Sequence, residues 1–243
     1  MLAFPSLDQT PAHTPAKHAE RVAGADGHLA WPSTRVFAGV RVPDTPLVAC
    51  ALKYAGTQLE PHLFNHAVRS WLFAVLLGEQ VGVPYDGEVL AVATLLHALG
   101  LAPSSDGELR FEVVGANSAR EFARDHGVGE ERSRLVWDGI ALSYTPSIGL
   151  HKEIEVALCV LGVGVDWGGW ALETIPSDRM SRILQEFPRL GMKHHLAHAI
   201  CRVAEQRPQA TYDGDAHDFG ERFVPGYRVP SKVDALFDSP FEE

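Results

Sequence analysis

Apolar residues recur at helical spacing over most of the chain after residue 45. Their spacing predicts a helix from about Pro46 and a longer one over about 63–76. A third helix begins near Asp86, a residue type that caps helix N-termini, and stops at Gly100, a type that ends them. Further helices are predicted at about residues 117–126, 130–142, 152–161, 177–187 and 191–204. The region 103–114 has room for a short extended piece, but no set of alternating strands suffices for a sheet, so the fold is predicted to be all-α.

The two ends of the chain lack this periodicity. Residues 1–32 are rich in Pro, His, Ala and Gly, which predicts a flexible arm. Residues 33–243 are then predicted to form a single helical domain. After Gln206 the chain is rich in Pro, Gly, Asp and aromatic residues, which predicts a long irregular tail laid over the helices.

Charge and cysteine content narrow the function classes. A formal net charge of -10 and the lack of a dense Lys/Arg stripe argue against nucleic-acid binding. The sequence has no run of 18 apolar residues that would span a membrane, and its three cysteines are too few and too scattered for a disulfide framework. We therefore expect a cytoplasmic protein that acts on a small molecule, and homo-oligomer formation stays open.

Three side chains stand out chemically because they interrupt apolar segments. His66 lies within the second predicted helix and His97 ends the third, so two helices each offer an imidazole, as in metal sites of helical bundles. Asp166 lies in the apolar run 158–167, where an unpaired carboxylate is costly and a cation is a favoured partner. Each has a structural alternative: a histidine that is only hydrogen-bonded, or an aspartate that caps a turn before Gly168.

The segments around these residues resemble a known family. Asn65-His66-Ala67-Val68-Arg69 and Leu95-Leu96-His97-Ala98-Leu99-Gly100 resemble motifs of the HD superfamily, named for its His-Asp pair, and in particular of its cyanamide hydratase-like branch. The likeness continues through Arg110-Phe111-Glu112, Gly115-Ala116-Asn117, Phe187-Pro188-Arg189 and Phe223-Val224-Pro225-Gly226-Tyr227. It implies an all-α fold, a divalent metal, and addition of water to, or hydrolysis of, a small substrate.

The sequence departs from this pattern at the ligand set. Ala98 stands where the superfamily has the aspartate, and Ser143-Tyr144 stands where this branch commonly has another histidine. A reduced site of His66, His97 and Asp166 could still hold Zn or Fe, because three protein ligands are common in catalytic sites. Water activated by that metal would then attack a nitrile-like or amide-like carbon.

Two other functions stay open beside this hydratase or hydrolase. Without metal, His66 and His97 would act as acid and base in a lyase, isomerase or cyclase, with Asp166 fixing a tautomer. Loss of a ligand carboxylate at position 98 is also compatible with a non-catalytic protein that binds a small molecule. The predicted substrate-binding residues for the enzymatic functions are Asn65, Arg69, Glu112, Asn117, Ser143 and Tyr144.

Overall fold

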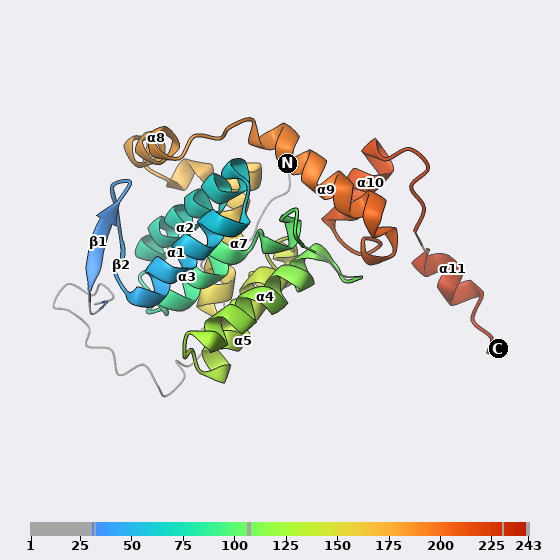
Figure 1. Cartoon of the computed structure of the whole chain (residues 1–243), viewed down its shortest axis with the longest axis horizontal. Coiled ribbons are helices and arrows are strands. Elements are labelled where there is room, and N and C mark those ends of the chain that lie inside the picture. Colours follow the sequence, from blue (N-terminus) through green and yellow to red (C-terminus); the bar gives the residue numbers. More distant parts are fainter. Residues whose placement is uncertain (1–30, 32, 106–107, 230, 242–243) are drawn as a thin grey trace.

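The computed structural model describes residues 31, 33–105, 108–229 and 231–241. Apart from Trp31, the predicted N-terminal arm therefore lies outside the described residues. The all-α prediction is confirmed, since helices make up most of the described chain and a two-stranded hairpin is its sheet (Figure 1). The α-helices are α1 (Pro46–Gln58), α2 (Pro61–Val81), α3 (Gly87–Leu96), α4 (Phe111–Asp125), α5 (Glu130–Ala141), α6 (Pro146–Gly149), α7 (Ile154–Gly168), α8 (Ser177–Glu186), α9 (Met192–Gln206), α10 (Asp215–Phe223) and α11 (Lys232–Phe237).

The hairpin is an addition that the sequence did not predict. Strands β1 (Thr34–Phe37) and β2 (Val40–Pro43) pair antiparallel, with Thr34 opposite Pro43. Val40 and Val42 are buried on one face of β2, whereas the exposed face of this strand carries Arg41. Four residues per strand are too few for the alternation to stand out from the surrounding helical pattern.

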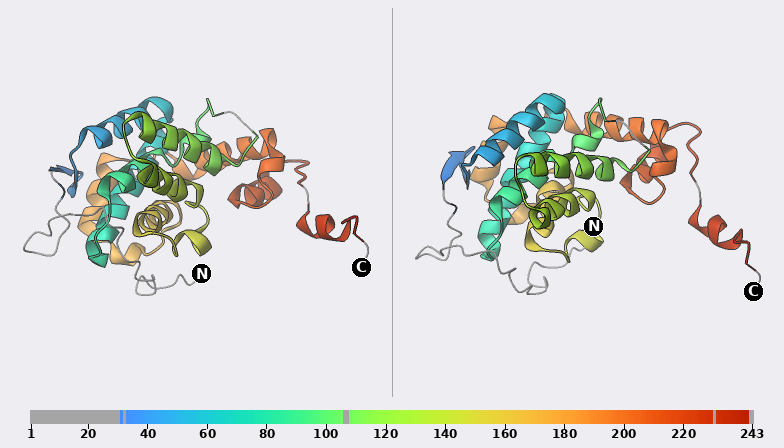
Figure 2. Two further views of the ribbon diagram at one scale, coloured as in Figure 1. Left: turned by 90° about the horizontal axis from the view of Figure 1, so that it is seen from below. Right: turned by 60° about the horizontal axis from the view of Figure 1, so that its bottom comes forward.

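Several element boundaries also differ from expectation. Helix α4 begins at Phe111, so part of the region with room for an extended piece is helical. Helix α7 continues to Gly168, and Asp166 lies in its last turn rather than in a loop. The tail is less irregular than predicted, because it contains α10 and α11. Figure 2 shows α11 standing apart from the helical body in both of its views.

Helix α2 is the centre of the fold. It packs most extensively against α7, while α3 and α5 pack beside this pair. Almost every side chain from Leu63 to Leu77 is buried, although the segment includes His66, Arg69 and Ser70. Buried polar groups require partners, so the polar residues of α2 must be paired by neighbouring helices.

Two glycines allow neighbouring segments to approach closely, and this approach positions the partners of the buried polar residues. A Cβ on Gly162 of α7 would lie 2.3 Å from the backbone oxygen of Ser70, so α7 touches the backbone of α2 there. Asp166 follows one turn later and meets α2 one turn before Ser70, as expected for antiparallel helices. At Gly100 in the 3-10 helix η2 (Leu99–Leu101), a Cβ would lie 1.7 Å from the backbone oxygen of Phe111, which holds the start of α4 against the segment that follows His97.

Among the described residues, no helix has both the length and the apolar character needed to cross a membrane.

Candidate functional site

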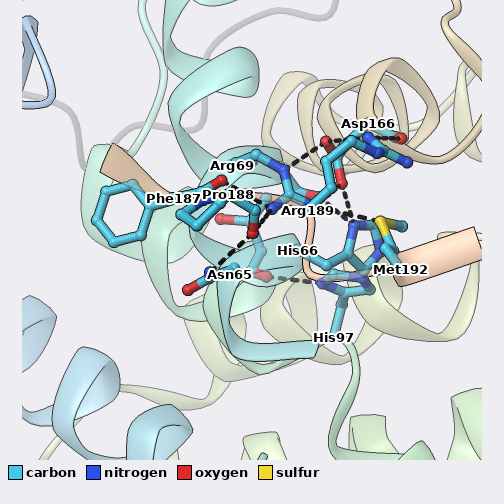
Figure 3. A network of polar contacts seen from close by, with 11 residues as sticks. Asn65, His66, Arg69, His97, Asp166, Phe187, Pro188, Arg189 and Met192 are labelled. Carbon is cyan, nitrogen blue, oxygen red and sulfur yellow. Dashed lines mark hydrogen bonds and ion pairs between the residues drawn. The ribbon is translucent and has the colours of Figure 1, made fainter. Parts of the chain in front are cut away.

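The structure brings the two predicted histidines into direct contact. His66 comes from the middle of α2, and His97 is the C-cap residue of α3. Both side chains are fully buried, and their Nε2 atoms are 3.1 Å apart (Figure 3). The rings meet edge to face, with an angle of 78° between their planes. The two histidines that stand out in the sequence therefore lie in direct contact.

The outer nitrogens of the two rings fix their tautomers. His66 Nδ1 is 2.7 Å from Asp166 Oδ2, and His97 Nδ1 is 2.8 Å from the Thr94 carbonyl oxygen. A carboxylate and a carbonyl both accept, so both Nδ1 atoms carry the hydrogen and donate it. If both rings were neutral, two Nε2 lone pairs would face each other at 3.1 Å. A cation must therefore lie between them, and one proton shared by the two nitrogens meets this need.

Asp166 has three cationic or proton-donating neighbours. Arg69 donates from Nε at 2.7 Å and from Nη2 at 2.8 Å, and Arg189 Nη1 donates to Oδ1 at 3.0 Å. Burial by itself raises the pKa of the Asp166 carboxyl, but the hydrogen bonds and positive charges of His66 and Arg69 lower that pKa far below its usual range. Asp166 is thus ionised, and it accepts the Nδ1 hydrogen of His66.

The loop between α8 and α9 is fastened onto this cluster. Arg69 Nη1 donates to the carbonyl oxygens of Phe187 and Pro188 at 3.0 and 3.2 Å, and Asn65 Nδ2 donates to Pro188 at 2.8 Å. Arg189 adds a second bond, to the Asp166 backbone oxygen. In the structure Asn65 and Arg69, predicted to bind substrate, hold this loop. Arg189 was not predicted as a site residue, although it lies in the quoted Phe-Pro-Arg segment.

The remaining predicted substrate residues fall into two groups. Asn117 is exposed, and its amide oxygen accepts a hydrogen bond from Trp137 Nε1. Ser143 is buried, and its hydroxyl donates to the carbonyl oxygen of Ile140, three residues earlier in the chain. Glu112 and Tyr144 are buried; Glu112 lies in the first turn of α4, and the Tyr144 ring contacts Phe111, the first residue of that helix. Of the predicted substrate residues outside α2, these two remain candidates for contact with a ligand.

A metal ion held by His66, His97 and Asp166 was one sequence expectation. The two converging Nε2 atoms suit two ligands of one ion. The Asp166 oxygens, however, bind Nδ1 of His66, on the other side of the ring, and two guanidinium groups. Among the described residues, no group of three or more His, Cys, Asp and Glu side chains is placed to hold an ion. Because zinc sites use three or four protein ligands, these residues do not fit a three-ligand metal site.

We expect the buried His66–His97 pair, the histidine dyad, to make the fold sensitive to acid. Burial, followed by the nearby charge of His66, lowers the pKa of His97 from 6.5 to about 3. The unfolded chain therefore binds this proton first as the pH falls, and the free energy of unfolding should decrease by up to about 1.4 kcal/mol per pH unit between roughly pH 6.5 and pH 3. Asp166, whose pKa is also lowered, adds a loss only below about pH 4, near the value of an unfolded aspartate.

Urea unfolding at several pH values, compared between the wild type and His97→Gln, would measure this slope. The variant should show a flatter dependence, and contributions of other groups cancel in the difference, including that of Asp215, whose pKa is raised to about 6. Identical slopes in the two proteins would mean that His97 is not kept neutral by folding.

Comparisons with known proteins give one match, to a family model. No curated protein matches the chain. Residues 63–153 match the family model described as the HD domain, and this segment contains both histidines, Ala98, Glu112 and Tyr144. Proteins with this domain are mostly phosphohydrolases and other hydrolases, and they typically bind divalent metals. Residues 63–153 are thus similar to an HD domain, and the all-α architecture of the described chain agrees with that likeness.

Proposed function

We propose that the protein is a hydratase that adds water to a small nitrile-like molecule, with His66 and His97 as its acid–base pair and without a resident metal. The observation that carries the proposal is the buried Nε2 pair, 3.1 Å apart, in which both Nδ1 hydrogens are already committed to acceptors. Such a pair shares one mobile proton, so that one Nε2 atom carries a hydrogen while the facing Nε2 atom carries a free lone pair. A substrate that enters between the rings meets a proton donor on one side and an acceptor on the other.

The roles of the two rings follow from their neighbours. His66 has the ionised Asp166 carboxylate at its outer nitrogen, and we therefore assign it as the proton donor. His97 has only the neutral Thr94 carbonyl at its outer nitrogen and stays neutral, so its Nε2 is the acceptor. Asp166, Arg69 and Arg189 are positioning residues, because they act through His66.

A proton balance can be written with these groups alone. Water forms a bond from its oxygen to the electrophilic carbon and loses a proton to His97 Nε2. His66 gives its Nε2 proton to the substrate nitrogen, whose multiple bond to carbon loses one electron pair. The product has gained both hydrogens and the oxygen of water. Return of the proton from His97 to His66 over the 3.1 Å between them restores the starting state.

Two considerations favour hydration over other proton-transfer reactions. Residues 63–153 match the HD domain, whose proteins are mostly hydrolases that use water. The segments around His66 and His97 also resemble the cyanamide hydratase-like branch. A lyase, isomerase or cyclase would use the same pair, and its products would identify it in the same experiment.

The test is a turnover screen with and without a chelator. Protein purified without a histidine tag would be incubated with cyanamide, small nitriles and small amides, and product would be followed by NMR, with metal content measured on the same sample. We expect turnover of at least one compound, a metal content well below one ion per chain, and no loss of rate in EDTA. Activity that EDTA removes and Zn²⁺ or Fe²⁺ restores would contradict the proposal, and no turnover of any compound would favour a non-catalytic binding protein.

A further inference from the structure

The Tyr144 hydroxyl is a buried polar group that the proposed reaction does not use. The side chain is 7% exposed, and the hydroxyl has no hydrogen-bond partner among the described residues. The ring is fixed by edge contacts with Phe111 and Trp167, whose centroids lie 5.5 and 6.3 Å away. Leaving a buried hydroxyl unpaired costs roughly 1–3 kcal/mol, so a group outside the protein is a natural partner for it.

The charges of three carboxylates act on this hydroxyl. Burial is the main cause of a raised Tyr144 pKa, and the charges that raise it further are those of Glu112, Asp215 and Asp166, in that order. Glu112 is 2% exposed in the first turn of α4, and Asp215 is the first residue of α10. The hydroxyl therefore lies in a negative field produced by residues from three helices, α4, α10 and α7.

Arg110 joins the two helices that carry Glu112 and Asp215. Its Nη2 donates to Glu112 Oε1 at 2.7 Å, and its Nη1 donates to the Asp213 carbonyl oxygen at 3.3 Å. A Cβ on Gly214 would lie 2.8 Å from Nη2, so the chain just before Asp215 rests on the guanidinium group. The contacts of Arg110 thus place Asp215 next to the start of α4.

The charges of this cluster do not balance. Arg110 is the cation that contacts Glu112, and no hydrogen bond or ion pair to the Asp215 carboxylate is seen in the described part of the chain. Burial, together with the charges of Glu112 and Asp218, raises the pKa of Asp215 to about 6. The charge of Arg110 opposes this shift but does not cancel it, so one guanidinium group serves both Glu112 and Asp215, and the Asp215 carboxylate is still ionised at neutral pH.

We propose that Glu112, Asp215 and Tyr144 form a subsite for an amidinium-type cation, the positively charged end of the small substrate. An amidinium group is planar and offers a fork of N–H donors, which matches carboxylate and hydroxyl oxygens as acceptors. Arg110, a guanidinium already bound to one oxygen of Glu112, shows that this surface accepts such a group. The inference rests on the proposed function, because it names the substrate class of that site.

Binding of acetamidinium chloride, measured by NMR titration or calorimetry on the full chain, tests the subsite. Acetamide is the matched neutral probe, since it has nearly the same shape without the charge. We expect acetamidinium to bind at least about tenfold more tightly than acetamide, and Asp215→Asn to weaken acetamidinium binding by about tenfold or more. Asp218→Asn is the matched control, because its side chain lies on the same helix but is 89% exposed. That variant should bind as the wild type does.

Tyr144→Phe supplies a second readout that does not depend on a correct guess of the probe. Without ligand, this variant should be at least as stable to heat as the wild type, since it loses an unpaired buried hydroxyl and keeps the ring. With acetamidinium it should bind about three- to tenfold more weakly. Equal affinities for the two probes, or equal effects of Asp215→Asn and Asp218→Asn, would overturn the subsite.

The experiments distinguish failure of the proposed subsite from failure of the proposed reaction. His97→Gln should reduce kcat by about 10²–10⁴-fold and leave acetamidinium binding within about twofold of the wild type, because His97 is outside the subsite. If turnover depends on His97 while Asp215→Asn binds acetamidinium normally, the proposed function stands and the subsite is wrong. If acetamidinium binds as expected but no compound is turned over, the subsite stands and the acid–base function is wrong.

Discussion

Asp166→Asn should lower the free energy of unfolding by about 3–5 kcal/mol at pH 7, the range expected when one partner of a buried ion pair is removed. The carboxylate is 1% exposed and accepts from His66, Arg69 and Arg189. Asparagine keeps the shape and one acceptor oxygen, but it leaves the fully buried Arg69 guanidinium without a counter-charge. Urea unfolding followed by circular dichroism would measure the loss.

Asp138→Asn is the matched control for this prediction. Asp138 also pairs with two cations, Arg134 at 2.9 Å and Lys152 at 3.0 Å, but these partners are 46% and 32% exposed. Solvent screens such pairs, so this variant should lose at most about 1 kcal/mol. Similar losses in the two variants would show that burial of the Asp166 cluster does not make its charge important for stability.

His97→Gln should reduce kcat by about 10²–10⁴-fold on any substrate that the screen identifies, which is the usual contribution of a positioned acid or base. Glutamine fills a similar volume and can still hydrogen-bond His66. It cannot accept and return a proton, so the relay over 3.1 Å is lost. Steady-state kinetics would give kcat and KM separately, and we expect the loss in kcat.

His195→Gln tests whether this effect belongs to the buried pair. His195 lies exposed on α9, where its ring stacks on that of His62 at 4.8 Å. The two substitutions remove the same ring, but only one removes it from the dyad, so His195→Gln should keep kcat within about twofold. A comparable loss in both variants would contradict the assignment of His97 as the proton acceptor.

The helical fold could be read from the sequence because its apolar periodicity is long and continuous. The start of α3 at its Asp86 cap follows local rules of helix capping, whereas α3 ends at Leu96, short of the predicted stop at Gly100, which lies in the 3-10 helix that follows. The hairpin, α10 and α11 were missed, since each is short, and short elements depend on packing rather than on a pattern of their own. The N-terminal arm and the single-domain organisation stay predictions.

For the site, sequence patterns identified the residues but not their contacts. His66, His97 and Asp166 stood out because polar residues interrupt apolar helices, and the structure places them in one hydrogen-bonded chain. Asp215 gave no signal, because an aspartate that begins a helix is common in any protein. The substrate, the cytoplasmic location and the oligomeric state remain predictions or open questions.

The sequence by itself determined the longer helices and which of their apolar segments carry polar groups, because both follow from local spacing and from the cost of burying an unpaired group. Only the tertiary structure decided what those groups do. The close approach of α2 and α7 at Gly162 brings Asp166 to Nδ1 of His66, and Thr94 takes Nδ1 of His97, so the two remaining nitrogens must share a proton. Tautomers depend on which acceptor each nitrogen meets: the acceptor of His66 lies 100 residues away in the sequence, and the two rings that meet are 31 residues apart.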